Sequence, residues 1–260
     1  MLIKETFVDI QTQNGLMRLL LIIPVTNIKN PKFPAILVFT EIYQITGPVK
    51  RFCARIASQG YIVACPESYH EFLPIGTVIP YDQIGTDLGN TLIEKHLHSY
   101  DNDVTSILNY LTTHPNCTGQ FGATGMCLGG HLAFRAAFDP RIKSTVCFFA
   151  TDIHSETLGK GKRSDSLKRS AEIKGELLMI FGKQDTHIPQ AGRTQIYNQL
   201  VTNNITFSWC EFQAQHAFIR DEKSKDRYDA ALTDNCFHLL KELFFRTLYV
   251  TPHPDLQNKL

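Results

Sequence analysis

Three side chains that could together break an acyl bond occur in a fixed order along the chain: Cys127, Asp185 and His216. A cysteine thiolate is a strong nucleophile, a histidine can accept and return a proton, and a carboxylate can orient that histidine. Each of the three lies just after a segment that is predicted to form a β-strand. Their types and order therefore predict covalent acyl transfer through a cysteine, a reaction that requires neither a metal nor an organic cofactor.

Cys127 lies in the sequence GMCLGG, residues 125–130, between a predicted strand of small residues and a predicted helix. This strand–turn–helix pattern is typical of a nucleophile elbow, whose flanking glycines let the turn pass close to its neighbours. The positive end of the helix favours the thiolate, and the backbone N–H of Leu128 would face a developing oxyanion. A buried structural cysteine beside a glycine-rich helix start is the competing interpretation.

The positions of Asp185 and His216 decide between these two interpretations. Asp185 follows the predicted strand 177–181, and His216 follows the predicted strand 205–211. A lone aspartate at such a place often caps a helix or forms a turn. Here both residues occur where an elbow of this kind requires first an acid and then a base. We therefore interpret Cys127, Asp185 and His216 as one catalytic triad.

The segments around these residues alternate between predicted strands and helices, which indicates an α/β fold with a mostly parallel sheet flanked by helices. An N-terminal β-hairpin is predicted around the turn signal Asn14-Gly15, and residues 1–250 are predicted to form one domain, followed by a tail over 251–260. Further strands are predicted at 35–39, 61–66, 119–124 and 144–150, and helices at 48–57, 104–111, 130–138, 190–201 and 228–248.

Other segments fall where a substrate pocket is expected. Glu41 follows the apolar run 35–39, at the type of strand end that lines the ligand crevice of open α/β sheets, although a solvated loop glutamate is the commoner alternative. Residues 66–98 contain several prolines and glycines and predict an excursion over the strand ends, a candidate lid. Residues 151–174 predict an exposed insertion, and His131 is interpreted as a packed helix residue.

Composition limits the classes of function. The chain has 260 residues, with 26 basic and 25 acidic side chains and a net charge of +1, so no general field attracts nucleic acid or an anionic membrane. The N-terminal segment lacks the pattern of a signal peptide, and no apolar run reaches the roughly 20 residues of a membrane span. The seven cysteines are scattered and lack a C-x-x-C pair, which favours reduced thiols over a disulfide framework or a zinc site. We expect a cytoplasmic protein.

These motifs resemble the dienelactone hydrolase family of α/β-hydrolases, and the resemblance extends over about residues 34–246. The family's cysteine, aspartate and histidine correspond to Cys127 in GMCLGG, Asp185 in GKQD and His216 in HAF. The resemblance implies that Glu41, in TEIY, is an active-site carboxylate that keeps the resting thiol hydrogen-bonded and then accepts its proton. The implied activity is hydrolysis of a small ester or lactone through an acyl-cysteine intermediate.

The resemblance also implies how the substrate is held. It assigns the backbone amides of Ile42 and Leu128 to an oxyanion hole, and Arg220 and Tyr43 to substrate binding. In characterised members a second arginine helps to hold a substrate carboxylate, and it comes from the segment that corresponds to residues 66–98. That segment contains no arginine in this chain. We therefore expect a weaker preference for carboxylate-bearing substrates, and a neutral substrate stays open.

Other protein classes share parts of this pattern. Flavodoxin-like chaperones carry G-x-C-x-G with a histidine directly after the cysteine, where this chain has Leu128. Glutamine amidotransferases carry a glutamate two residues after the distant histidine, where this chain has Phe218. A non-enzymatic ligand-binding or sensing protein that keeps the fold is the remaining alternative. Retention of all four polar residues of the predicted site favours the hydrolase.

Overall fold

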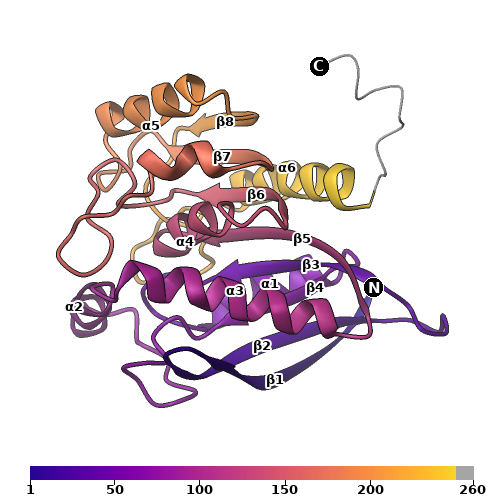
Figure 1. Ribbon diagram of the computed structural model, residues 1–260. Coiled ribbons are helices and arrows are strands. Elements are labelled where there is room, and N and C mark those ends of the chain that lie inside the picture. Colours follow the sequence, from indigo (N-terminus) through magenta and orange to yellow (C-terminus); the bar gives the residue numbers. More distant parts are fainter. Residues whose placement is uncertain (250–260) are drawn as a thin grey trace, which may run out of the picture.

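An eight-stranded sheet runs through the molecule in the order β1-β2-β4-β3-β5-β6-β7-β8 (Figure 1). The computed structural model describes residues 1–249, so the predicted tail over 251–260 lies outside the described residues. The strands are β1 (Leu2–Thr12), β2 (Gly15–Val25), β3 (Phe33–Phe39), β4 (Ile62–Pro66), β5 (Cys117–Met126), β6 (Ile142–Phe148), β7 (Glu176–Gly182) and β8 (Phe207–Phe212). The hairpin β1–β2 is antiparallel and β2 pairs antiparallel with β4, whereas the other strand pairs are parallel. The predicted α/β-hydrolase architecture with its N-terminal hairpin is confirmed.

Helices cover both faces of this sheet. In Figure 1, α3 (Leu97–Thr113) and α4 (Leu128–Ala136) lie in front of the strands, whereas α1 (Gly47–Ala57) and α6 (Ala230–Leu248) lie behind them. Two further helices, α2 (Gln83–Leu92) and α5 (Gln190–Thr202), lie towards the left of the view. This covering explains why β3 and β4 are continuous apolar runs: both faces of a central parallel strand are removed from water.

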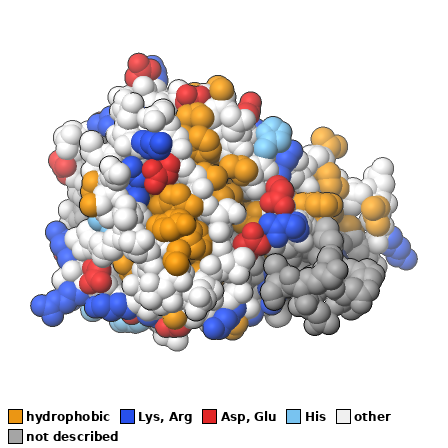
Figure 2. Space-filling view, turned by 90° about the horizontal axis from the view of Figure 1, so that it is seen from above, with side chains coloured by type: hydrophobic (Ala, Val, Ile, Leu, Met, Phe, Trp, Pro, Cys, Tyr) orange, Lys and Arg blue, Asp and Glu red, His pale blue; other side chains and the backbone are white. Residues whose placement is uncertain are grey.

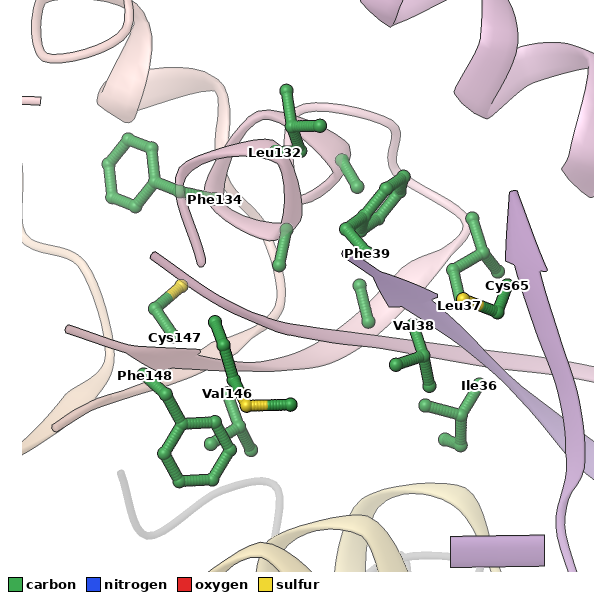
Figure 3. Close-up of a cluster of buried hydrophobic side chains, with 14 of the residues drawn as sticks. Ile36, Leu37, Val38, Phe39, Cys65, Leu132, Phe134, Val146, Cys147 and Phe148 are labelled. Carbon is green, nitrogen blue, oxygen red and sulfur yellow. The ribbon is translucent and has the colours of Figure 1, made fainter. Parts of the chain in front are cut away.

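The side chains of β3 alternate between the two halves of the core. Figure 3 shows Leu37 and Phe39 on the side of Leu132, which belongs to α4, and Ile36 and Val38 on the opposite side. All residues of β3 are buried. Burying a large aliphatic or aromatic side chain contributes roughly 1.5–3 kcal/mol. The strand that leads to Glu41 is therefore held firmly from both sides.

The strands that follow β3 in the chain lie on both sides of it in the sheet, so the strand order reverses between β3 and β5. From β3 the chain first adds β4 on one side, then returns to add β5 on the other side, and continues to β8. Such a switch point opens a crevice beyond the carboxyl ends of the two strands, because their connections leave in opposite directions. Glu41 follows β3 and Cys127 follows β5, so both lie at this crevice.

The excursion over residues 66–98 contains α2 and is tied to α3 by a buried lysine. The ammonium of Lys95 lies 2.5 Å from Asp103 and 2.8 Å from Glu71, and its side chain is fully buried. His70 adds a contact of 3.1 Å to Asp103. Within residues 1–249, these acidic groups and His70 are a cluster that could hold a metal ion, but Lys95 already provides the positive charge between them. Movement of this segment as a lid stays a prediction.

The segment 151–174 differs from the exposed insertion that its composition predicts. It packs Ile153, Leu158 and Leu167 into the core and includes a short 3-10 helix, η1 (Lys168–Glu172). Its serines explain how a polar sequence can be buried, because Ser164 and Ser166 hydrogen-bond each other and Ser166 also bonds to His131. His131 is fully buried, which confirms its interpretation as a packed helix residue.

Hydrophobic side chains gather on the face of the molecule that carries α5 and β8 (Figure 2). On α5, Tyr197 and Val201 are exposed, and the ring of Tyr197 packs edge-on against Phe207 and Trp209 of β8.

In the part of the chain that the structure describes, no helix combines the length and the apolar character that crossing a bilayer would need.

Candidate active site

The turn between β5 and α4 holds Cys127 in an uncommon backbone conformation, with φ of +58°. Residues other than glycine rarely adopt such a φ, and they keep it only where the surrounding structure enforces it. A Cβ on Gly125 would lie 2.2 Å from the carbonyl oxygen of Gly129, and a Cβ on Gly129 would lie 2.2 Å from that of Phe39. Glycine at both positions is therefore required for this close packing, which presents Cys127 at the N-terminus of α4.

His216 and Asp185 form the second part of the site. The Nδ1 atom of His216 lies 2.7 Å from Oδ2 of Asp185, and both side chains are buried. The other oxygen, Oδ1, accepts the backbone N–H of His187 at 2.8 Å. Burial alone would raise the pKa of Asp185, but the hydrogen bond and charge of His216, together with this N–H, outweigh it and hold the pKa below its usual range.

Cys127 and His216 interact electrostatically. Burial disfavours the charged imidazolium, but the negative charge of the Cys127 sulfur and the hydrogen bond with Asp185 outweigh this cost and raise the pKa of His216 to about 10. The imidazole of His216 thus lies between Cys127 and Asp185, and both favour its protonated form. The structure thus brings together the three residues that the sequence predicts as a triad.

Glu41 lies in the same pocket, but other groups occupy its two oxygens. Its Oε1 accepts from Arg220 at 3.1 Å, and its Oε2 accepts from the hydroxyl of Tyr81 at 3.3 Å. Burial raises the pKa of Glu41, and the charge of Arg220 only partly offsets this. No hydrogen bond joins Glu41 to Cys127 among the residues described, so a role for Glu41 as proton acceptor stays a prediction.

Arg220 is buried, with only 7% of its surface exposed, rather than lying at the surface. Its guanidinium lies 4.6 Å from the ring centre of Tyr81 and 5.7 Å from that of Tyr43. The neighbouring Asp221 pairs instead with Arg51, at 2.5 Å. Arg220 is therefore enclosed by Glu41 and two aromatic rings before any substrate arrives.

A pocket of about 310 Å³ connects these groups. Asp185 is the one residue predicted for catalysis or substrate binding that is not part of the lining, since it lies behind His216. The lining contains the others: Glu41, Ile42, Tyr43, Cys127, Leu128, His216 and Arg220. Leu128 is the first residue of α4, so its N–H has no acceptor within the helix and is free for a ligand. The pocket is large enough for a small-molecule substrate.

The lining also includes residues that sequence reasoning did not select. His187 lies beside His216, with ring centres 4.5 Å apart, and its position two residues after Asp185 was a signal that could have identified it. Lys225 and Arg227 come from the loop between β8 and α6. Tyr81, which contacts Glu41, belongs to the irregular excursion, where no periodicity or motif marks a single residue. His154, in the segment 151–174, lies in a loop against Gly192.

The fold and this site define an α/β-hydrolase. A family model described as the dienelactone hydrolase family matches residues 21–248. A relative from Saccharomyces cerevisiae, "Putative carboxymethylenebutenolidase", is 46% identical over 258 residues, which cover 96% of this chain and 94% of the relative. "Carboxymethylenebutenolidase" from Pseudomonas putida is 25% identical over 193 residues, covering 74% of this chain and 77% of that enzyme.

A solved structure agrees with these matches at the level of the fold. The crystal structure described as a putative dienelactone hydrolase from Klebsiella pneumoniae superposes with a TM-score of 0.76 at 19% identity, covering 94% of this chain and 99% of that one. The chain belongs to the dienelactone hydrolase family, as the resemblance of its motifs implied.

Proposed function

We propose that this protein hydrolyses a small ester or lactone through an acyl-cysteine intermediate on Cys127. The observation that carries the proposal is the juxtaposition, in one pocket, of a cysteine held at a helix N-terminus and a buried histidine that bonds to Asp185 at 2.7 Å. Membership of a hydrolase family and the names of its relatives support the substrate class.

The first half of the reaction forms a thioester. The Cys127 thiolate attacks the carbonyl carbon, and the resulting oxyanion lies near the backbone N–H groups of Leu128 and Ile42. The carbon–oxygen bond then breaks, and the leaving alkoxide takes a proton from the His216 imidazolium. Asp185 lies 2.7 Å from Nδ1 of His216 and favours the imidazolium that donates this proton. In a lactone the new hydroxyl group stays attached to the acyl chain.

The second half returns the enzyme to its starting state. Neutral His216 accepts a proton from water as that water attacks the thioester, the carbon–sulfur bond breaks, and the thiolate leaves as the acid product forms. Asp185 keeps Nδ1 of His216 in place and stabilises the imidazolium in both halves. Every step uses side chains of the pocket, water and the substrate.

Glu41 and Arg220 have a supporting role in this proposal. Their ion pair at 3.1 Å places a carboxylate close to the triad without leaving its charge unbalanced. Binding of an anionic substrate near Arg220 would weaken that pair and release Glu41 towards Cys127, where it would take the proton of the resting thiol to give the attacking thiolate and would return that proton when the thiolate leaves. This is the role as proton acceptor that the family resemblance implies for Glu41.

The test is hydrolysis of a panel of small esters and lactones by the wild type and by Cys127→Ala. We expect the wild type to turn over at least one member of the panel and the variant to lose at least about 10³-fold in kcat, because no other group replaces the nucleophile. Cys53→Ala is the control, since Cys53 is a buried residue of α1 and does not line the pocket. Equal turnover by Cys127→Ala and the wild type would refute the proposal.

A further inference from the structure

The basic side chains that line the pocket differ in whether they already form an ion pair with another residue. Arg220 is buried and bonds to Glu41. Lys225 and Arg227 line the same pocket, Lys225 exposed and Arg227 half-buried, and neither has an ion-pair partner within residues 1–249. These two cations, rather than Arg220, are therefore free to meet a ligand.

The acidic residues around Lys225 and Arg227 are directed elsewhere. Asp226, which lies between them in the chain, is exposed and is not part of the pocket lining. The other acids of this loop each have a partner of their own: Asp221 pairs with Arg51, Glu222 accepts from Ser224, and Asp229 caps α6 by accepting from the N–H of Leu232. Lys225 and Arg227 thus line the pocket, whereas none of the acidic residues of this loop does.

The charges that line the pocket leave an excess of positive charge. Glu41 and Arg220 neutralise each other at 3.1 Å. Asp152 is the other acidic residue of the lining, and it accepts from the hydroxyl of Thr157 at 2.5 Å. Lys225 and Arg227 together therefore exceed Asp152 by one positive charge, which a single substrate carboxylate would balance.

We propose that Lys225 and Arg227 form the subsite that binds a carboxylate of the substrate, an inference that rests on the proposed function and deepens it. A guanidinium can hold a carboxylate through two parallel hydrogen bonds, and an ammonium adds a point charge. The subsite comes from the loop after β8, whereas the excursion over 66–98 contains no arginine. This chain therefore has a separate means of recognising an anion.

The experiment compares two esters that differ in one group: the anionic ester carries a carboxylate, and the neutral ester carries a methyl amide in its place. In Lys225→Ala/Arg227→Ala, we expect the loss of kcat/KM on the anionic ester to exceed the loss on the neutral ester by about tenfold or more, because two charge-assisted contacts are removed. The matched control is Lys223→Ala, since Lys223 is exposed on the same loop but does not line the pocket. Arg227→Lys with Lys225 intact should keep part of the preference.

A binding titration separates this inference from the proposed function. Cys127→Ala cannot form the thioester, so calorimetry with the anionic ester reports affinity alone. Adding the two alanine substitutions to Cys127→Ala should raise the Kd for that ester about tenfold or more. High salt should reduce this difference in Kd between the two variants. Equal losses on both esters, or an unchanged Kd, would overturn the subsite. If the wild type hydrolysed neither ester, the proposed function would fail for this pair, and the titration would still decide on the subsite.

Discussion

Glu41 and Arg220 are buried residues of opposite charge in the pocket that contains Cys127, and each depends on the other. Removing one partner of a buried ion pair leaves an uncompensated charge, which typically costs about 3–5 kcal/mol. The pKa of Glu41 is already raised by burial, so its ionised form is disfavoured even with Arg220 present. A group whose pKa is higher in the folded than in the unfolded state costs stability as the pH rises through its folded pKa.

We therefore predict that Arg220→Met destabilises the protein more at pH 8 than at pH 5. Without the guanidinium the pKa of Glu41 rises further, so at pH 5 Glu41 takes up a proton and avoids much of the cost, whereas at pH 8 its charge must be buried. Urea denaturation at both pH values measures the difference, which we expect to reach about 1–3 kcal/mol. The double variant Glu41→Gln/Arg220→Met should recover most of the stability. A loss independent of pH would indicate that packing of the Arg220 stem, rather than its charge, is what matters.

Asp185 sets the charge state of His216, and this leads to a prediction about pH dependence. In Asp185→Asn, His216 loses a partner that stabilises its cation, so its pKa should fall below the value of about 10 in the wild type. In the proposed mechanism protonated His216 releases the leaving group, so the alkaline limb of the profile of kcat against pH should move to lower pH, with a loss in kcat of about 10²-fold or more. An unshifted limb with normal kcat would leave Asp185 with a purely structural role.

At the scale of elements, the contact between β3, β5 and α4 fixes the position of Cys127, the proposed nucleophile. The backbone of Phe39, at the end of β3, packs against Gly129 so closely that no side chain fits between them. The strand that leads to Glu41 and the helix that begins at Leu128 are thereby held in one arrangement. The positive φ of Cys127 is maintained because the close contacts of Gly125 with Gly129 and of Gly129 with Phe39 hold the turn in place.

Gly129→Ala should consequently displace α4 from β3. We expect a loss of about 1–3 kcal/mol in the free energy of unfolding, as for other overpacked sites. Activity should fall by more than the fraction of unfolded protein explains, since the displaced residue is next but one to Cys127. Gly47→Ala is the control, because a Cβ there would meet only the flexible side chain of Arg51 at 3.2 Å. A fully active, stable Gly129→Ala would contradict this account of the elbow.

Elements with clear periodicity could be predicted from the sequence, and those elements place the triad. Apolar runs before Glu41 and Asp185 mark central strands, and a parallel sheet brings strand ends to one edge. Residues in irregular segments could not be predicted. Tyr81 contacts Glu41, and Arg227 lines the pocket, from loops whose paths depend on tertiary packing. The burial of 151–174 depends on hydrogen bonds among its serines.

At the scale of the whole molecule, the proposed recognition of substrate depends on local charge. The net charge is +1, so the protein as a whole provides no strong field that would steer an anion. The switch point between β3 and β5 concentrates the chemistry at one crevice, and the loop after β8 adds positive charge there. The proposed selectivity for a carboxylate thus arises from a few side chains of one pocket rather than from the surface.

The most direct test of the proposed mechanism is to trap the intermediate. Wild-type protein mixed with excess ester and quenched in acid within milliseconds should carry one acyl group, and peptide mass spectrometry should place it on Cys127. His216→Gln should form this adduct much more slowly for the same ester, because the leaving alkoxide then lacks its proton donor in the first half of the reaction. Turnover of the ester without any adduct on Cys127, or with an adduct on another residue, would contradict the proposal.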